Sequence, residues 1–249
     1  MQVIGVALPI IKPGDNLPEM ILIAADKVGG LRDGDVLVIS SKIVATSQGR
    51  IKELSRIKPS TRAKKIAVRS GQAPEFVELV LHEADKVLRV CKGAILTIKE
   101  GLICANAGAD LSNAPRGQTI LMPAKPDTAA EALRKALSEG SGAKIGVVIS
   151  DSVVRPLRLG TVGQAIGVAG IEPVIDCRGQ PDIYGRPLKI TFRAIADQLA
   201  TAAELVMGEA NEKIPVVIVR DAVVEFVEKP KHSAKISQKQ CIYYGGMDI

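Results

Sequence analysis

The stretch from Ile145 to Asp176, IGVVISDSVVRPLRLGTVGQAIGVAGIEPVID, decides how the rest of the chain is interpreted. It begins with a β-branched apolar run, 145 to 149, which is typical of a buried strand. Ser150, Asp151 and Ser152 follow at once. A carboxylate flanked by hydroxyls at the end of a buried strand is well placed to hold a hard cation.

Basic residues and glycines complete this stretch. Arg155 and Arg158 lie three residues apart, close to the carboxylate, and glycines follow at positions 160, 163, 167 and 170. We interpret the glycines as a glycine-rich loop where backbone approaches a ligand or another strand closely. Together these parts predict a metal-assisted phosphate site. Neither G-x-x-x-x-G-K-[ST] nor G-x-G-x-x-G occurs, so a P-loop is excluded and a Rossmann fold is weakly supported.

Three further charged side chains lie at the ends of expected elements. Lys42 follows the apolar strand pattern of residues 35–40, Asp110 lies in the small-residue segment CANAGADLSNAP, and Glu209 follows the long helical pattern of residues 193–208. Each also has an ordinary interpretation: a solvated lysine, a turn aspartate and an exposed carboxylate. Two aspartates with hydroxyls and a glutamate would form an all-oxygen donor set, which suits Mg²⁺ or Mn²⁺ better than zinc. Residue types alone therefore indicate a metal-dependent nucleotide or phosphate enzyme.

Composition narrows the class of protein. The 249 residues carry a net charge of +6, 2% aromatic residues, two histidines and four cysteines without CxxC spacing. Two histidines leave little room for a His-rich zinc site, and the chain has neither a long basic run nor an aromatic platform for nucleic acid. No signal peptide and no run long enough to cross a membrane is recognisable. We expect a cytoplasmic protein with free thiols, without nucleic-acid or membrane partners.

The alternation of helical and strand patterns predicts an α+β (mixed α/β) fold, with mixed sheets, flanking helices and room for two subdomains. We assign residues 1–249 to one domain. Strands are predicted at 3–7, 35–40, 87–90, 94–98, 102–105, 119–122, 145–149, 188–192 and 215–219. Helices are predicted from the cap at Asp15 or Asn16 to Gly29, at 61–69, from Pro74 onward, at 128–138 with Asp127 as cap, and at 193–208.

Several long motifs, in order along nearly the whole chain, carry a family resemblance. They are ALPII, GDVLVISSKIV, CANAGADLSNAP, ISDSVVRPLRLGTVGQAIGVAG, EPVIDCRGQPDIYGRPLKIT and ATAAELVMGEA. Together they resemble the coenzyme F420-0:L-glutamate ligase family, also called the F420 γ-glutamyl ligase family. Motifs that recur in a fixed order are far more specific than any one of them.

The resemblance implies a GTP-dependent acid–amino-acid ligase that forms an amide between coenzyme F420-0 and L-glutamate through an acyl phosphate. It also implies Mg²⁺ or Mn²⁺, K⁺ and an intertwined homodimer. By motif, the metal ligands would be Asp110, Asp151, Ser152 and Glu209, and the catalytic residues Asp151, Arg155 and Lys42. The GTP-binding positions would be Leu8, Pro9, Ile10, Ile11, Ser41, Lys42, Thr46, Asn113, Leu205, Met207, Gly208 and Glu209.

The sequence departs from the family pattern at Thr46, Val154, Leu157 and Thr161, and more mildly at Ser152. Most of these positions flank the predicted metal carboxylate, so they bear on the acceptor pocket and the nucleotide contacts. Two alternatives therefore stay open: a paralogous amide ligase with another acceptor, and a non-catalytic protein that binds a nucleotide or F420.

Overall fold

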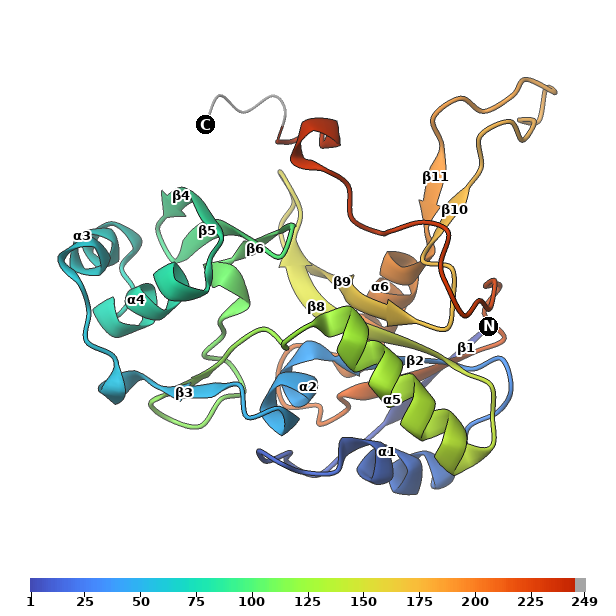
Figure 1. Cartoon of the computed structure of the whole chain (residues 1–249), viewed down its shortest axis with the longest axis horizontal. Helices are drawn as coiled ribbons and strands as arrows, with labels where there is room; N and C mark the ends of the chain where they lie inside the picture. The colour runs from blue at the N-terminus through green and yellow to red at the C-terminus, as the bar shows by residue number, and fades with distance from the viewer. Residues whose placement is uncertain (245–249) are drawn as a thin grey trace. The chain divides into compact units, whose positions relative to one another are not determined.

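The computed structural model describes residues 1–244; residues 245–249, the end of the predicted domain, lie outside the described part (Figure 1). The chain divides into two compact units. The first combines Met1–Ser47 with Lys125–Ala234, and the second combines Gln48–Ala124 with the segment from Lys235 onward. Helices occur beside sheets with both parallel and antiparallel strands, which confirms the α+β prediction. None of the described helices is long and apolar enough to span a membrane.

A five-stranded mixed sheet is the centre of the first unit. Its strands, in spatial order, are β1 (Gln2–Val6), β12 (Val216–Arg220), β2 (Val36–Ser40), β8 (Gly146–Val154) and β9 (Thr161–Ala169). Only the β2–β8 pair is parallel. Val36 through Ile39 are fully buried, and neighbouring residues of a strand point to opposite faces. Both faces of the sheet are therefore covered.

Helices supply that cover. Helix α6 (Ile195–Met207) packs with Ile195, Leu199 and Ala203 on one face of the sheet. Helices α5 (Pro126–Ser141) and α1 (Leu17–Asp26) pack against each other, and Figure 1 shows α5 in front of the sheet and α6 behind it. The Asn16 side chain accepts a hydrogen bond from the Glu19 backbone, which confirms the predicted cap of α1.

Two glycines of β9 allow these helices to approach closely. A Cβ atom at Gly163 would collide with the backbone of Ala200 in α6, and one at Gly167 would collide with Pro126 at the start of α5. The Thr201 hydroxyl donates to the Gly163 carbonyl at 2.9 Å. The predicted glycine-rich phosphate loop is therefore wrong for Gly163 and Gly167, which lie in a strand against helix backbone; Gly160 and Gly170 lie just before and just after that strand.

Acidic residues in the first turns of both helices also bind β9. The Ala165 amide donates to Asp197 of α6 at 2.9 Å, and the Val168 amide donates to Asp127 of α5 at 3.1 Å. The β8–β9 pairing shifts register at Ile149, and this bulge interrupts the regular ladder beside these amides. Asp127 does not cap its helix as predicted; the cap position is Lys125, and the Asp127 carboxylate bonds to the strand.

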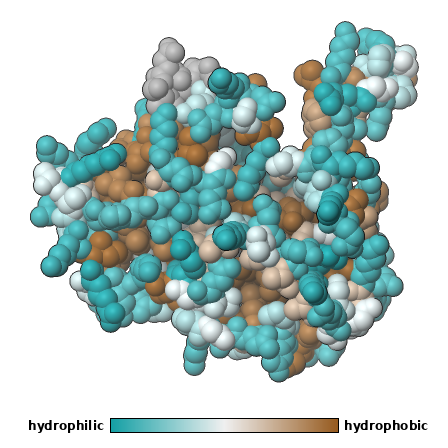
Figure 2. All heavy atoms as spheres, viewed as in Figure 1, coloured by the Kyte–Doolittle hydropathy of each residue, from teal (hydrophilic) through white to brown (hydrophobic). Residues whose placement is uncertain are grey.

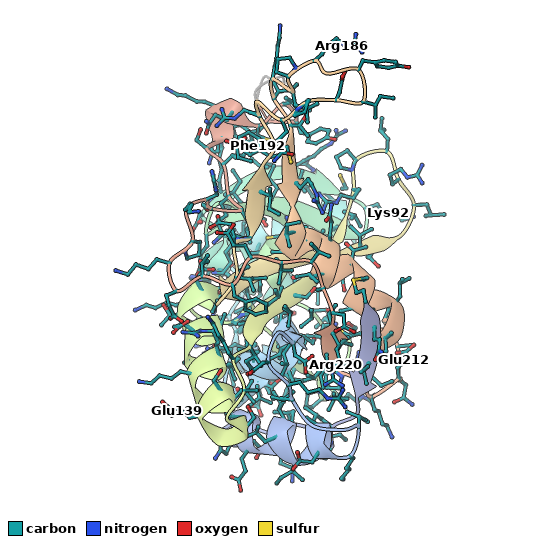
Figure 3. All side chains as sticks on the ribbon, turned by 90° about the vertical axis from the view of Figure 1, so that its right-hand side faces the viewer. Lys92, Glu139, Arg186, Phe192, Glu212 and Arg220 are labelled. Carbon is teal, nitrogen blue, oxygen red and sulfur yellow. The ribbon has the colours of Figure 1, made fainter. Side chains whose placement is uncertain are left out.

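A buried ion pair lies where β2 begins and β12 ends, two neighbouring strands in the interior of the sheet. Asp35 is fully buried, Arg220 is 7% exposed, and the guanidinium bonds both carboxylate oxygens at 2.8 and 2.9 Å. Arg220 also donates to the Gly30 carbonyl. The pair therefore joins β2, β12 and the loop after α1; Figure 3 labels Arg220 within the body of the unit. Breaking one partner of such a pair leaves a buried charge uncompensated.

A hairpin projects from the first unit (Figure 1). Its short strands are β10 (Val174–Asp176) and β11 (Phe192–Ala194), and residues 188–191 are irregular, so the strand predicted at 188–192 is wrong. Asp176 forms an ion pair with Arg178 at 2.7 Å, and the Arg178 guanidinium lies over the Phe192 ring. Figure 2 shows the tip as mainly hydrophilic, and Figure 3 places Arg186 there and Phe192 nearer the base.

The second unit has its own core. Helices α3 (Thr61–Ser70) and α4 (Pro74–Glu83) pack with Phe76, Val77 and Ile95 beside the three-stranded sheet β4 (Lys86–Cys91), β5 (Ala94–Lys99) and β6 (Leu102–Ala105). A two-stranded sheet joins β3 (Ile51–Glu53) and β7 (Gln118–Ile120). Glu83 accepts from both Arg50 and Lys99 at 2.9 Å, which ties α4 to β5. The predicted β5–β6 turn at Glu100–Gly101 is confirmed, since both residues have positive φ.

Gly163→Ala tests whether close backbone approach fixes α6 on β9. The added methyl group collides with helix backbone, so we expect a loss of unfolding free energy of about 3 kcal/mol or more. Gly49→Ala is the matched control: Gly49 has positive φ but open space around its Cβ position, so only about 1 kcal/mol should be lost. Urea unfolding of both variants measures the difference. Equal losses would show that packing at Gly163 has no special importance.

Candidate functional site

Sheet register brings Ser41 next to Asp151. Ser40 pairs with Ser150 in the parallel β2–β8 ladder, so the two following residues lie beside each other. The Ser41 hydroxyl donates to the Asp151 carboxylate at 2.8 Å. Ser41 begins helix α2 (Ser41–Ser47), which the sequence analysis did not predict, and Lys42 follows it. Three of the predicted site residues are thus close together at one end of two neighbouring strands.

Asp151 does not end its strand as predicted. Strand β8 continues to Val154 and forms a long hairpin with β9, in which Asp151 pairs with Gln164 and Ser152 with Gly163. Because successive residues of a strand alternate between faces, Asp151 and Ser152 point to opposite faces of this hairpin. The predicted oxygen donors of the first unit therefore form two groups: Asp151 with Ser41, and Ser152 with the residues at the end of α6.

The second group lies on the face that α6 covers. Ala200 packs on Gly163, and Glu204 lies four residues later, one turn further along the same helix face. On the strand side, Thr161 lies two residues before Gly163 and so points to the same face. The Thr161 hydroxyl donates to Glu209 at 2.6 Å. Ser152, Thr161, Glu204 and Glu209 thus form one cluster, which we call the carboxylate pair cluster.

Glu204 is the unusual member of this cluster. Each of its carboxylate oxygens exposes less than 1 Å², and its polar neighbours are Glu209, Ser152 and Thr161. Burial, together with the neighbouring Glu209 carboxylate, raises the pKa of Glu204 to about 7. Burial would also raise the pKa of Glu209, but its hydrogen bonds from Glu204, Thr161 and Ser152 and the charge of Lys42 outweigh burial and lower it.

The donor chemistry of these residues suits a hard divalent cation. Among residues 1–244 no three His, Cys, Asp or Glu side chains converge to hold a metal by themselves. The carboxylate pair cluster offers two carboxylates and two hydroxyls, and Asp151 offers a third carboxylate on the other face of the hairpin. Mg²⁺ is commonly bound by one or two carboxylates together with substrate phosphates and water, so these residues fit a cation that a phosphate ligand completes.

Asp110 lies in the second unit. Its backbone pairs with Ile120, and its carboxylate accepts from the Ser112 amide at 2.7 Å and the Ser112 hydroxyl at 2.8 Å. Asn113 is exposed with positive φ, so the segment is a tight Asx-type turn. The meeting of Asp110 with Asp151 stays a prediction. The turn holds the Asp110 carboxylate in a fixed orientation.

The predicted GTP-binding positions of the first unit lie in three places. Leu8 and Ile11 are buried, Pro9 and Ile10 are exposed, and the Leu8 amide donates to Lys213 in the segment after α6. Thr46 is buried within α2. At the end of α6, Leu205, Gly208 and Glu209 are exposed and Met207 is half-buried. The loop after β1 therefore runs beside the segment that follows α6.

Arg155 and Arg158 lie in the exposed loop of the β8–β9 hairpin. The Arg158 amide donates to the Arg155 carbonyl at 3.2 Å, and Leu157 between them has positive φ and is fully exposed. Both guanidiniums are therefore available to an anionic ligand. Thr161 of the carboxylate pair cluster follows this loop directly in the chain.

Sequence reasoning missed Glu204. The helical pattern places it beside Ala203, at the border of the apolar face, where a glutamate normally reaches solvent. Gly163 was the feature of the sequence that could have indicated this burial. A strand glycine lets a helix pack so closely that the next polar residue on the sheet-facing side of the helix becomes buried. Thr161 was noticed only as a departure from the family pattern, and its bond to Glu209 depends on the hairpin.

Fold and site together define an α+β protein whose main sheet carries hydroxyls, carboxylates and cations suited to a metal-bound phosphate ligand. A family model described as F420-0:Gamma-glutamyl ligase matches residues 5–221, and the chain belongs to that family. The matched range includes every member of the carboxylate pair cluster, and Asp110 and Asp151.

Several curated relatives support this assignment, each named Coenzyme F420:L-glutamate ligase. The protein of Methanopyrus kandleri is 46% identical over 211 residues, which cover 84% of this chain and 82% of the relative. That of Methanocaldococcus jannaschii is 44% identical over 227 residues, covering 91% and 90%. That of Archaeoglobus fulgidus is 43% identical over 213 residues, covering 86% and 84%.

The raised pKa of Glu204 predicts a pH dependence of stability. A carboxyl group whose pKa is higher in the folded state binds more protons there than in the unfolded state. Its contribution to the free energy of unfolding is therefore lost as the pH rises from 4.5, the ordinary pKa, through about 7. Allowing for solvent screening, we expect metal-free protein to lose about 1–2 kcal/mol of unfolding free energy over this window.

Glu204→Gln should remove this part of the pH dependence, and chemical unfolding across the pH range measures it. Glu139→Gln, on the exposed end of α5, is the control and should keep the wild-type profile (Figure 3). Identical profiles for wild type and Glu204→Gln would contradict the raised pKa.

Proposed function

We propose that this protein is a GTP-dependent ligase that joins L-glutamate to coenzyme F420-0 through an amide bond. The observation that carries the proposal is the family match over residues 5–221, together with relatives of that printed activity at 43–46% identity. Ser41, Lys42 and Asp151 at the ends of β2 and β8 support it, because this is where a nucleotide phosphate would meet both a carboxylate and a cation.

The proposed reaction has two steps. A carboxylate oxygen of F420-0 attacks the γ-phosphorus of GTP, which forms an acyl phosphate and releases GDP. The amine of L-glutamate then attacks the acyl carbon, which forms the amide and releases phosphate and a proton. Negative charge on the transferred phosphoryl group must be neutralised in the first step. Lys42 and Arg155 would supply cationic side chains for this purpose.

Asp110, Asp151, Ser152 and Glu209 would hold Mg²⁺ or Mn²⁺, which when bound would neutralise phosphate charge. GTP would contact residues 8–11, Ser41, Thr46, Asn113 and residues 205–209. K⁺ dependence, a homodimer and a cytoplasmic location complete the proposal. The donor set supports a hard cation because it consists of carboxylates and hydroxyls without thiols or imidazoles.

A paralogous amide ligase with another acceptor is the second candidate. Two departures from the family pattern, Val154 and Thr161, form the last pair of the β8–β9 ladder, and Leu157 is fully exposed in the adjoining loop. Thr161 also bonds directly to Glu209. These changes lie on the hairpin that carries Asp151, so they favour an altered acceptor over an altered nucleotide step.

The direct test is an assay with F420-0, L-glutamate, GTP and Mn²⁺, with mass spectrometry of the product and measurement of GDP. We expect glutamylated F420 that depends on GTP. GDP formation only with a different acceptor acid would favour the paralogous ligase. Folded protein that consumes no GTP with any acceptor would reject both and favour a non-catalytic binding protein.

Asp151→Asn tests the proposed metal carboxylate. Asparagine keeps the shape and still accepts from Ser41, so the thermal unfolding temperature should change little, while GTP-dependent turnover should fall by about a hundredfold or more. Asp110→Asn should behave alike. Asp26→Asn, an exposed change at the end of α1, is the matched control and should retain activity. Wild-type turnover in Asp151→Asn would remove Asp151 from the proposed metal ligands.

A further inference from the structure

The positive charge of this protein is concentrated in one of its two units. Residues 48–124 contain 13 Lys and Arg and 7 Asp and Glu, a net charge of +6, while the rest of the chain contains equal numbers of both kinds. Within this range, residues 54–74 contain six basic residues and no acidic one. An excess of charge in one part of a molecule attracts ligands of opposite charge to that part. The second unit therefore favours an anionic partner.

Four exposed cations of this unit form a row. Three of them are three or four residues apart in α3, so they follow one side of the helix over about 10 Å. The fourth lies in the β4–β5 turn, where the Gly93 amide donates to the Ser70 carbonyl at the end of α3 at 2.8 Å. These side chains, which we call the basic stripe, are Arg62, Lys65, Arg69 and Lys92.

Acidic side chains of the second unit are engaged elsewhere. Glu83 pairs with Arg50 and Lys99 at 2.9 Å, and Glu78 pairs with His82 at 3.0 Å. None of the ion pairs among residues 1–244 includes a member of the basic stripe. The four cationic groups are therefore available to a ligand.

The basic stripe reduces the stability of the helix that carries it. Like charges three or four residues apart repel each other, and α3 has two such pairs, Arg62 with Lys65 and Lys65 with Arg69. The first turn, where the helix dipole favours acidic residues, contains Arg62 and no acidic residue. Glutamine has nearly the helix propensity of lysine and arginine, so neutral side chains would serve folding at least as well. Residues that reduce local stability are typical of functional surfaces.

The surroundings of the basic stripe limit the kind of anion that fits it. Val68 is exposed in α3, but the helix has no leucine or aromatic residue that could enter a membrane or stack on a base. The Ser60 hydroxyl caps α3 and donates to Glu78, so a carboxylate lies at the helix end where a phosphate would otherwise bind. A row of separate cations with these neighbours fits an extended chain of carboxylates.

We propose that the basic stripe is a docking surface for an oligo-γ-glutamyl chain. This choice among carboxylate chains rests on the proposed function, because each glutamate joined to the coenzyme leaves one more carboxylate on the product. Several carboxylates on one flexible chain pair with several separate cations at once, whereas a single glutamate pairs with few of them. The stripe would therefore retain a coenzyme that already carries glutamates and release one that carries none.

The test measures binding of a fluorescein-labelled γ-linked hexaglutamate by fluorescence anisotropy, at low salt and at about 0.15 M salt. We expect the wild type to bind it, more weakly at the higher salt concentration. Arg62→Gln combined with Lys65→Gln should weaken binding by about fivefold or more, since two ion pairs are lost. The thermal unfolding temperature of this variant should stay the same or rise, because repulsion within α3 is removed.

Two further double variants complete the test. Arg69→Gln combined with Lys92→Gln removes the other end of the basic stripe and should weaken binding to a similar extent. Lys135→Gln combined with Lys144→Gln is the matched control, because it removes the same charge from exposed positions of the first unit. We expect the control to bind within about twofold of the wild type, because its two lysines lie outside the stripe.

Three results would overturn the proposal. One is a wild type that does not bind the hexaglutamate at either salt concentration. Another is an equal loss in the stripe variants and the control, which would show an effect of net charge alone. The third is tighter binding of α-linked hexaglutamate, or of duplex DNA of equal charge, than of the γ-linked chain. GTP and F420-0 are absent from these measurements, so failure of the ligase assay and failure of this proposal are separate results.

Discussion

The approach of α6 to β9 at Gly163 is the constraint on which the candidate site depends. A helix normally stands off a sheet by the length of its side chains, but here strand glycine meets helix backbone directly. The Thr201 and Asp197 bonds fix the rotation and the position of the helix along the strand. Once the helix is fixed, its next inward residue, Glu204, must lie against the hairpin, and Glu209 must follow at its end. The burial of the Glu204 carboxylate oxygens is therefore a consequence of packing that begins two turns earlier.

The register of the sheet positions the residues on the other face of the β8–β9 hairpin, as helix packing positions those on the first. Parallel pairing of β2 with β8 places Ser41 beside Asp151, and at the opposite end the Asp35–Arg220 pair ties β2 to β12. The β8–β9 hairpin presents Asp151 on one of its faces and Ser152 on the other. The long β8–β9 hairpin therefore contributes to both groups of oxygen donors. It connects two predicted metal ligands, Asp151 in the sheet and Glu209 at the end of α6.

The sequence predicted the elements with strong periodicity and the residues at their ends. Strand β2, the capped helix α1 and helix α6 formed as predicted, and Lys42, Asp151 and Glu209 lie at or near the main sheet. The glycines were misassigned because spacing alone does not distinguish a loop from a strand that packs against helices. The length of β8 was missed because three polar residues, Ser150 to Ser152, interrupt its apolar pattern, and its pairing with β9 becomes visible only in the hairpin. Glu204 was missed because burial of its oxygens depends on the distance of the helix from the sheet, which no local pattern encodes.

The small number of carboxylates on each face of the hairpin explains how binding of the nucleotide and binding of the cation would depend on each other. Glu204 and Glu209 give two carboxylates on one face, and Asp151 gives one on the other, so neither group within the first unit completes the coordination of a divalent ion. Mg²⁺ keeps its water readily and binds to proteins largely through substrate phosphates. A nucleotide that brings phosphate oxygens to these carboxylates would supply the missing ligands, and the cation would in turn neutralise repulsion between phosphate and carboxylate. In a ligase of this construction, metal affinity would be weak in the free protein and would rise when the nucleotide binds, which is the linkage expected when two ligands share one coordination shell.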